Sequence, residues 1–383
     1  MNRSFSIYLD GLRFSAALVV LLCHATYSRY TTHFAHLFGP YGHDAVIVFF
    51  VLSGYVIGFS ASNKDATVGR YAISRSARIY SVVVPAILMT IIVDYIGMSF
   101  FPAHFPHEYQ FDKLWAYVPF YLGFGTDLWF ANETMLSNGP FWSLSYEVWY
   151  YALFAGAFYL AGRRRVFAML AVLLIIGPRQ WLLFPIWMAG CLLYFNHDRY
   201  RLKAGLARAL FVTSIAVYGV TKYLGGFDFL NGWINVTFGG FPEEQLRYSQ
   251  YFLGDYLIAL LVGLNIWSAL YCNFRFSPSV SKGIRLAASF TFSLYLFHDP
   301  LLQFYSAVIG ATPASTTDFM LVLACVCLTV VLLGMFTERR KHVARRLIER
   351  GVNASRQVAE FAFATVYAAT GRRERDGTEA KPD

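Results

Sequence analysis

Residues 317–337 read TDFMLVLACVCLTVVLLGMFT, and no charged side chain follows Asp318 in this stretch. A helix needs about 20 apolar residues to cross a bilayer, so this stretch predicts a membrane-spanning helix. Comparable apolar stretches recur near residues 8–27, 42–60, 79–98, 142–161, 166–178, 180–195, 205–224, 251–272 and 287–309. The sequence therefore predicts an all-α, polytopic membrane helix bundle of about ten transmembrane helices.

The composition of the 383-residue chain agrees with this prediction. Hydrophobic residues make up 57% of the chain, charged residues only 14%, and the mean hydropathy is +0.45. An ordinary soluble domain has about 25% charged residues, and this chain has too few to cover a water-exposed surface. A soluble enzyme, a disordered chain and a disulfide scaffold are therefore excluded. The five cysteines lie inside apolar segments without a Cys-x-x-Cys pair, so we expect no metal site.

The basic residues indicate the orientation of the bundle. Lys and Arg number 32 against 23 Asp and Glu, a formal charge of +9. An excess of Lys and Arg marks cytoplasmic loops, and the loops obey this rule when both termini are cytoplasmic. We leave the short aromatic run 115–124 outside the count, because a full crossing there would place Arg163, Arg164 and Arg165 on the outer side. Nucleic acid is not an expected partner, because these basic residues belong to membrane loops.

The chain divides into two parts near the end of the last apolar stretch. Residues 1–337 form the predicted transmembrane domain, and residues 338–383 a basic, partly amphipathic cytoplasmic tail. Basic and apolar residues alternate at roughly helical spacing after Thr337. This pattern is typical of a helix that lies on an anionic membrane surface, so membrane lipid is an expected partner.

Ionisable residues inside the first span are functional candidates, because a central charge costs about 2.5–3.5 kcal/mol on insertion. Arg13 and His24 are eleven residues apart, close to three helical turns, so both project from one face. Asp10 lies three residues before Arg13 and can pair with it. An interfacial ion pair beside an ordinary buried histidine would give the same pattern.

A second cluster opens the span after the long loop, where residues 141–147 read FWSLSYE. Ser143 and Glu147 are four residues apart and share a helical face. A carboxylate just inside the bilayer can orient a histidine or act as an acid or base. A helix N-terminus that favours Glu147 through its dipole is the structural alternative.

The third cluster lies at residues 293–300, which read SLYLFHDP. His298 and Asp299 fall near the middle of a span, where both are costly, and Pro300 can open the helix locally. The alternative is a structural kink beside a satisfied histidine.

A fourth cluster consists of Arg75 and Arg78 in the loop before span 79–98. These residues are three apart and are expected to share a helical face. Guanidinium groups match phosphate geometry bidentately, so the pair is a plausible anchor for a phosphorylated ligand. The excess of basic residues in cytoplasmic loops explains the same two arginines without a ligand.

These elements, in this order, resemble the acyltransferase-3 family of integral membrane acyltransferases. The matching motifs are YLDGLR at 8–13 with His24 after a ten-residue gap, VFFVLSGY at 48–55, Arg75-x-x-Arg78, WSLSYE at 142–147 and SLYLFHDP at 293–300. The chain departs from the family pattern at Arg78, where proline follows only at Pro85.

The resemblance implies transfer of an acyl group, usually acetyl, from acyl-CoA to a hydroxyl of a carbohydrate or glycolipid acceptor. It also implies a bacterial inner membrane location. The implied catalytic residues are His24, Glu147 and His298. The implied donor-binding residues are Arg75, Arg78 and Arg13, and the implied substrate-binding residues are Trp142 and Ser143. His24 would act as the base or carry the acyl group itself, and Glu147 would orient His24 or handle the proton from the other side.

Two other classes of function compete with this interpretation. A proton-coupled transporter would use His298, Asp299 and Glu147 as a relay, but matching broken segments in two halves are not visible. A scaffold acting through its basic tail would leave the ionisable residues in the spans unexplained. The sequence leaves a homo-oligomer open.

Overall fold

The computed structural model describes residues 2–105, 109–237, 243–355 and 357, and within them the regular secondary structure is helical apart from one isolated β-bridge. The α-helices are α1 Arg3–Ala25, α2 Gly39–Asn63, α3 Val68–Phe100, α4 Leu114–Leu122, α5 Phe141–Tyr159, α6 Gly162–Ile176, α7 Pro178–Asn196, α8 Ala204–Tyr223, α9 Gly226–Thr237, α10 Glu243–Leu246, α11 Phe252–Tyr271, α12 Pro278–Ala288, α13 Thr291–Ile309 and α14 Thr316–Phe336. Short 3₁₀ turns occupy Pro102–His104, Phe111–Lys113, Arg247–Tyr251 and Glu338–Arg340. The all-α prediction is confirmed for this part of the chain.

A helix occupies each of the ten stretches predicted to span the membrane. Within the described residues, six helices are long and apolar enough to cross a bilayer: Arg3–Ala25, Gly39–Asn63, Val68–Phe100, Ala204–Tyr223, Arg247–Tyr271 and Thr316–Ser355. The chain is therefore a multi-pass membrane protein. The finer count of ten spans and the cytoplasmic placement of both termini stay predictions. The aromatic run 115–124 forms the nine-residue helix α4, which is too short for a full crossing.

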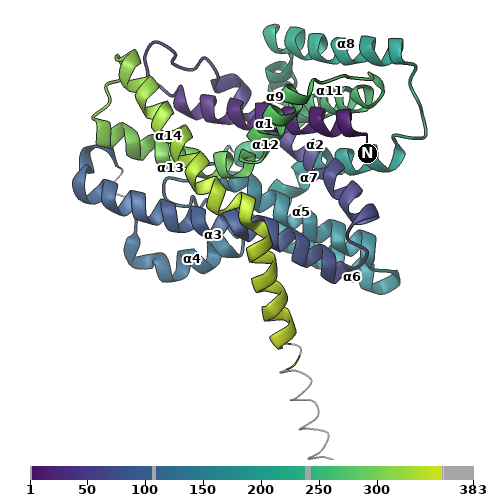
Figure 1. Cartoon of the computed structure of the whole chain (residues 1–383), viewed down its shortest axis with the longest axis horizontal. Coiled ribbons are helices and arrows are strands. Elements are labelled where there is room, and N and C mark those ends of the chain that lie inside the picture. Colours follow the sequence, from purple (N-terminus) through teal and green to yellow (C-terminus); the bar gives the residue numbers. More distant parts are fainter. Residues whose placement is uncertain (1, 106–108, 238–242, 356, 358–383) are drawn as a thin grey trace, which may run out of the picture.

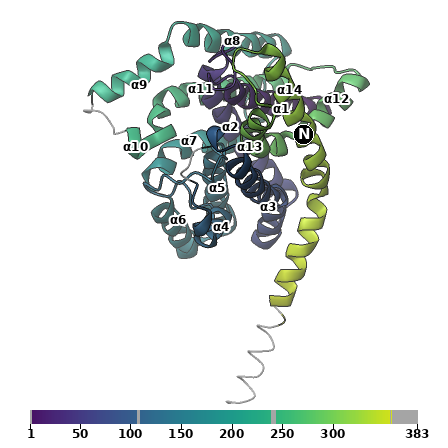
Figure 2. The same ribbon diagram turned by 90° about the vertical axis from the view of Figure 1, so that its left-hand side faces the viewer.

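Helix α1 lies inside the bundle, where it packs against α2, α11, α12 and α13 (Figure 1). Helix α3 lies along α13, and α2 lies along α7. Viewed from the side in Figure 2, α3, α5 and α13 gather beneath α1 and α2. This arrangement brings residues from the first and last thirds of the chain together around α1.

The contact between α2 and α7 depends on two glycines. A Cβ atom at Gly54 would overlap the carbonyl oxygen of Trp187, and one at Gly190 would overlap the carbonyl oxygen of Val51. Small residues allow helix backbones to approach closely, as these two do. The close approach places the Trp187 indole nitrogen 3.1 Å from the hydroxyl of Ser53, whose position it fixes.

Helix α13 continues through Pro300, so the expected local opening is not found. Proline has no N–H to donate to the carbonyl four residues earlier, which here belongs to Leu296. The side-chain amide of Asn138 donates to that carbonyl instead, at 2.8 Å. The substitute hydrogen bond accounts for the unbroken helix that carries His298.

Residues 341–355 form a further helix beyond the last 3₁₀ turn, which we call the tail helix. It leaves the bundle and runs across the direction of α3 in Figure 1, and it projects beyond the bundle again in Figure 2. The turn before it is anchored, because a carboxylate oxygen of Glu338 accepts the backbone N–H groups of Phe292 and Ser293 at 3.1 and 3.0 Å. Glu338 thereby caps the first turn of α13.

Candidate active site

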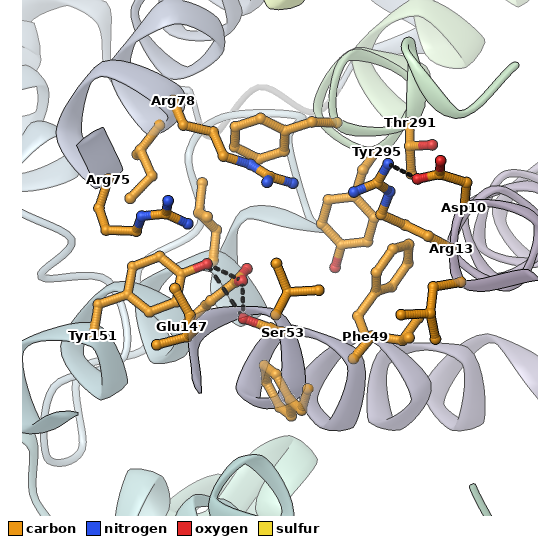
Figure 3. A pocket seen from close by; sticks show the side chains of 18 of the residues that line it. Asp10, Arg13, Phe49, Ser53, Arg75, Arg78, Glu147, Tyr151, Thr291 and Tyr295 are labelled. Carbon is orange, nitrogen blue, oxygen red and sulfur yellow. Dashed lines mark hydrogen bonds and ion pairs between the residues drawn. The ribbon is translucent and has the colours of Figure 1, made fainter. Parts of the chain in front are cut away.

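A cavity of about 230 Å³ lies between α1, α2, α3, α5 and α13, and we call it the arginine pocket (Figure 3). Its polar lining consists of Ser6, Asp10, Arg13, Ser53, Lys64, Arg75, Arg78, Ser143, Glu147, Tyr151, Thr291, Tyr295 and Glu338. In Figure 3 the side chains of Arg75 and Arg78 enter from α3, and that of Arg13 enters from α1 on another side. The structure thus brings all three predicted donor-binding arginines into one cavity.

The arginines retain hydrogen-bonding capacity within this pocket. Arg13 pairs with Asp10 at 2.9 Å, as the spacing predicted, but its buried Nε atom has no partner in the described part of the chain. Arg75 lies 3.0 Å from the Ser60 hydroxyl and 3.5 Å from Asp65, and its buried Nε likewise lacks a partner there.

Arg78 makes neither a side-chain hydrogen bond nor an ion pair with any described residue, although it lines the same cavity as Arg13 and Arg75. Arg78 is half-buried, whereas the Nε atoms of Arg13 and Arg75 are buried without a partner, which is unfavourable in an isolated protein. Donors of this kind suit an anion with several oxygens, such as a phosphate.

Ser143 and Glu147 both line the arginine pocket, so the predicted shared face of α5 is confirmed. The hydroxyls of Ser53 and Tyr151 donate to the Glu147 carboxylate (Figure 3). The Ser143 hydroxyl lies 2.5 Å from the hydroxyl of Tyr295. Glu147 is therefore held by hydroxyl groups of α2 and α5.

His24, near the end of α1, faces His298 of α13. The Nδ1 atom of His298 lies 2.9 Å from the carbonyl of Leu294, which can only accept, so its proton sits on Nδ1. Its Nε2 atom is then an acceptor, 3.0 Å from Nδ1 of His24. His24 Nδ1 also lies 2.9 Å from the carbonyl of Val20, which can only accept. Nδ1 of His24 therefore carries the proton that His298 Nε2 accepts. The lone pair of neutral His24 is consequently on Nε2.

Glu147 and His24 have different hydrogen-bond partners. The bonds of Glu147 go to Ser53 and Tyr151, whereas the ring that contacts His24 is that of His298. The roles predicted for Glu147, to orient His24 or to handle the proton from the other side, stay predictions. Tyr295 connects the two regions, because it lines the arginine pocket and its ring lies 6.3 Å from that of His298.

Aromatic and charged groups surround the histidine pair on the side of the loop between α1 and α2. The Tyr27 ring lies 5.3 Å from that of His24, and burial raises the pKa of Tyr27 above its usual value, so the phenol is protonated. Asp299 accepts the Gly139 N–H at 3.3 Å, and its other oxygen lies 3.7 Å from the guanidinium of Arg29. The pair is thus bordered by groups that can hydrogen-bond to a polar molecule.

Trp142 lies outside the arginine pocket. Its ring stacks on that of Tyr248 at 4.0 Å with an interplanar angle of 11°, and it also lies parallel to the ring of His43 at 6.3 Å. The structure therefore separates the two predicted substrate-binding residues: Ser143 lines the pocket, and Trp142 belongs to an aromatic stack.

Glu338 is a pocket residue that the sequence analysis missed, as it did Tyr151. The sequence division at residue 337 assigned it to the tail, but the structure places it in the pocket lining, where it caps α13. The available signal was a lone acidic residue directly after the last apolar stretch and before three basic residues. Within the described residues, no group of three or more His, Cys, Asp or Glu side chains is arranged to hold a metal ion.

The motifs around this site have counterparts in known proteins. A family model described as an acyltransferase domain, of the acyltransferase-3 type, matches residues 6–338. The chain belongs to this family. Acyltransferase MdmB of Streptomyces mycarofaciens is 35% identical to it over 155 residues, which cover 38% of this chain and 37% of that protein. The search of solved structures found no significant match.

The match of this acyltransferase-3 chain includes Glu338 at its end and spans the arginine pocket and both histidines. The chain is therefore a multi-pass member of an acyltransferase family. The segment aligned with MdmB covers well under half of each protein.

Proposed function

We propose that this membrane acyltransferase moves an acyl group, with acetyl as the expected group, from acyl-CoA to a hydroxyl of a carbohydrate or cell-envelope glycan. The observation that carries the proposal is the His24–His298 contact of 3.0 Å beyond an arginine-lined pocket. A basic pocket suits the donor, and a histidine with a free Nε2 suits removal of a hydroxyl proton.

The donor would bind with its phosphates on Arg75 and Arg78. Two features support this placement: Arg78 has no ion pair among the described residues, and the Nε atom of Arg75 is buried without a partner. Arg13 would line the path of the pantetheine arm, because it lines the same cavity as Arg75 and Arg78. Ser143 and Tyr295 would border the thioester on its way to His24.

The chemistry assigned to His24 is general base catalysis. Its Nε2 atom takes the proton of the acceptor hydroxyl while the hydroxyl oxygen attacks the thioester carbonyl carbon. The carbon–sulfur bond then breaks, and the protonated imidazole returns the proton to the CoA thiolate. His298 acts through His24, because its Nε2 accepts the Nδ1–H and so holds the reactive tautomer.

A covalent course is the alternative for the same residue. His24 would attack the thioester itself, release CoA and pass the acyl group to the acceptor in a second step. Labelled acyl-CoA supplied without acceptor separates the two courses, because only the covalent course leaves label on the protein.

The acceptor would approach from the side of Tyr27 and Asp299, opposite the arginine pocket along α1. The family suggests a bacterial inner membrane, with acyl-CoA on the cytoplasmic side. The aromatic stack of Trp142 and Tyr248 is a candidate surface for a sugar ring, because aromatic faces pack against the apolar faces of sugars.

The test uses membrane vesicles that contain either the wild type or His24→Ala, supplied with acetyl-CoA labelled in its acetyl group. We expect label on polysaccharide or glycolipid and release of free CoA with the wild type. His24→Ala should lose transfer by about 10²–10⁴-fold, the usual contribution of a general base.

His33→Ala provides the matched control, because His33 is exposed in the loop that follows α1. This variant should transfer label as the wild type does. Equal transfer by His24→Ala, from correctly inserted protein, would contradict the proposed mechanism. Proton uptake into vesicles without acyl-CoA would instead favour a transporter.

A further inference from the structure

The tail helix divides cleanly into polar and apolar rows. Side chains four residues apart lie above one another on a helix, so residues 341, 345 and 349 form one row and residues 342, 346 and 350 the next. These two adjacent rows consist of Lys341, Arg345, Glu349, His342, Arg346 and Arg350. The other half of the helix carries Val343 and Leu347 in one row and Ala344 and Ile348 in the other.

The apolar rows are largely uncovered within the described part of the chain. Leu347 is 61% exposed and Val343 38%, although both belong to the apolar half. On the polar half, the guanidinium of Arg345 pairs with the carboxylate of Glu349 at 2.8 Å. An amphipathic helix with an uncovered apolar face is unfavourable in water and implies a surface that covers it.

The charges identify that surface. Residues 341–355 hold four basic side chains, Lys341, Arg345, Arg346 and Arg350, against one acidic side chain, Glu349, and Arg339 and Arg340 directly precede them. A basic amphipathic helix is complementary to anionic phospholipid, because its apolar face enters the acyl-chain region while its cations meet the head groups.

The tail helix begins where the last apolar stretch ends. It follows α14 and continues out of the bundle, in much the same direction as α14 in Figure 1. A basic amphipathic segment directly after an apolar span is placed where lipid head groups lie. Its start is fixed to the bundle, because only two residues separate Lys341 from Glu338, which caps α13 at the arginine pocket.

We propose that the tail helix binds an anionic phospholipid surface, with Val343, Leu347 and Ile348 inserted between the lipids and the arginines on the head groups. The leaflet concerned is the one at the arginine-pocket end of the bundle. This binding would hold Glu338 at the pocket, which Arg13 and Arg78 also line.

The experiment places a nitroxide spin label on the full chain in lipid nanodiscs. Cys325→Ala and Cys327→Ala remove the two cysteines that are not buried, and the label is attached at Leu347→Cys or, as the matched control, at Arg345→Cys. The two positions are two residues apart and so face nearly opposite sides of the helix, about 200° around it. Accessibility to oxygen reports insertion, and accessibility to a water-soluble nickel complex reports exposure.

In nanodiscs of phosphatidylcholine with phosphatidylglycerol, we expect the label at 347 to be oxygen-accessible and nickel-shielded, and the label at 345 to show the reverse. Arg346→Glu with Arg350→Glu should weaken insertion about tenfold or more, because each basic residue contributes to binding an anionic surface. Equal nickel accessibility at 347 and 345 in anionic nanodiscs would overturn the proposal. Shielding of 347 from both oxygen and nickel would also overturn it, because a second copy of the chain would then cover the apolar rows.

Discussion

Two cavities lie on different sides of α1, and their contrast identifies the site. The arginine pocket has a volume of about 230 Å³, whereas the second cavity, between α1, α2, α8 and α11, has about 450 Å³. We call the second one the apolar cavity. Its lining includes Leu12, Ala16, Val48, Ile215, Leu261 and Val262. The larger cavity is therefore not the one lined by the arginines and Glu147 of the family's motifs.

The register of α1 creates this difference. Ser6, Leu9, Asp10 and Arg13 line the arginine pocket, and Leu12, Ser15, Ala16 and Val19 line the apolar cavity. Both sets follow the three- and four-residue spacing of one helical face, and the second set is displaced by six residues. Six residues correspond to about one and two-thirds turns, so one helix separates a polar space from an apolar one.

The two cavities differ in whether their buried polar atoms have hydrogen-bond partners, and this difference says more about ligand binding than their volumes do. In the apolar cavity Asp44 lies 2.7 Å from both Lys222 and Tyr218, and Asn265 lies 2.9 Å from Ser214. Among the described residues, no buried side-chain polar atom of that cavity lacks a partner, whereas Arg13 and Arg75 each have one that does. A ligand with anionic oxygens would therefore gain most in the arginine pocket.

The largest effect beyond His24 itself is expected at His298. His298→Ala removes the acceptor that holds the His24 proton on Nδ1, so kcat for transfer should fall about 10²-fold. The Michaelis constant for acyl-CoA should stay within about twofold, because His298 lies outside the arginine pocket. Steady-state kinetics with labelled acetyl-CoA measures both quantities.

His298→Gln is the informative companion variant. A glutamine oxygen can accept the Nδ1–H of His24, so this variant should recover part of the lost kcat. Similar losses in the Ala and Gln variants, or a large rise in the donor constant, would show that His298 does not act through the His24 tautomer.

Arg75→Ala combined with Arg78→Ala tests the donor side of the comparison. Hydrogen bonds to charged groups contribute about 1.5–3 kcal/mol each, so the Michaelis constant for acyl-CoA should rise at least about tenfold. The Michaelis constant for the acceptor should change much less, because the acceptor would bind near His24. Initial rates at varied donor and fixed acceptor concentration provide the measurement.

Arg70→Ala is the control for this double variant. Arg70 belongs to the same helix α3 but is exposed and does not line the arginine pocket. The Michaelis constant of Arg70→Ala for acyl-CoA should match that of the wild type. An unchanged constant in the double variant would mean that Arg75 and Arg78 serve only the orientation of the protein in the membrane.

Local spacing predicted the parts of the site that lie on one helix. The Asp10–Arg13 pair and the shared face of Ser143 and Glu147 follow from the helical period, and the structure contains both. The helices themselves follow from apolar stretches whose length is set by the bilayer. Such features need no knowledge of how the helices pack.

Contacts between distant helices could not be predicted in this way. His24 and His298 are 274 residues apart, and their contact depends on the packing of α1 against α13. Glu338 appeared to belong to the basic tail, because its role depends on where α14 ends relative to α13. Hydrophobic periodicity shows which face of a helix is buried but not which helix covers it.

The smallest effect is expected when the apolar cavity is filled. Val262→Phe places a larger apolar side chain in the space between α8, α11 and α1, and partly buried Val262 has room on its cavity side. Because α1 lies between the two cavities, kcat and the Michaelis constant for acyl-CoA should both change by less than about twofold. Circular dichroism and thermal unfolding in detergent would verify that the variant keeps its fold. A tenfold loss of transfer in a well-folded Val262→Phe would mean that the apolar cavity holds part of a substrate, and the division of the molecule by α1 into a reactive and an unreactive side would fail.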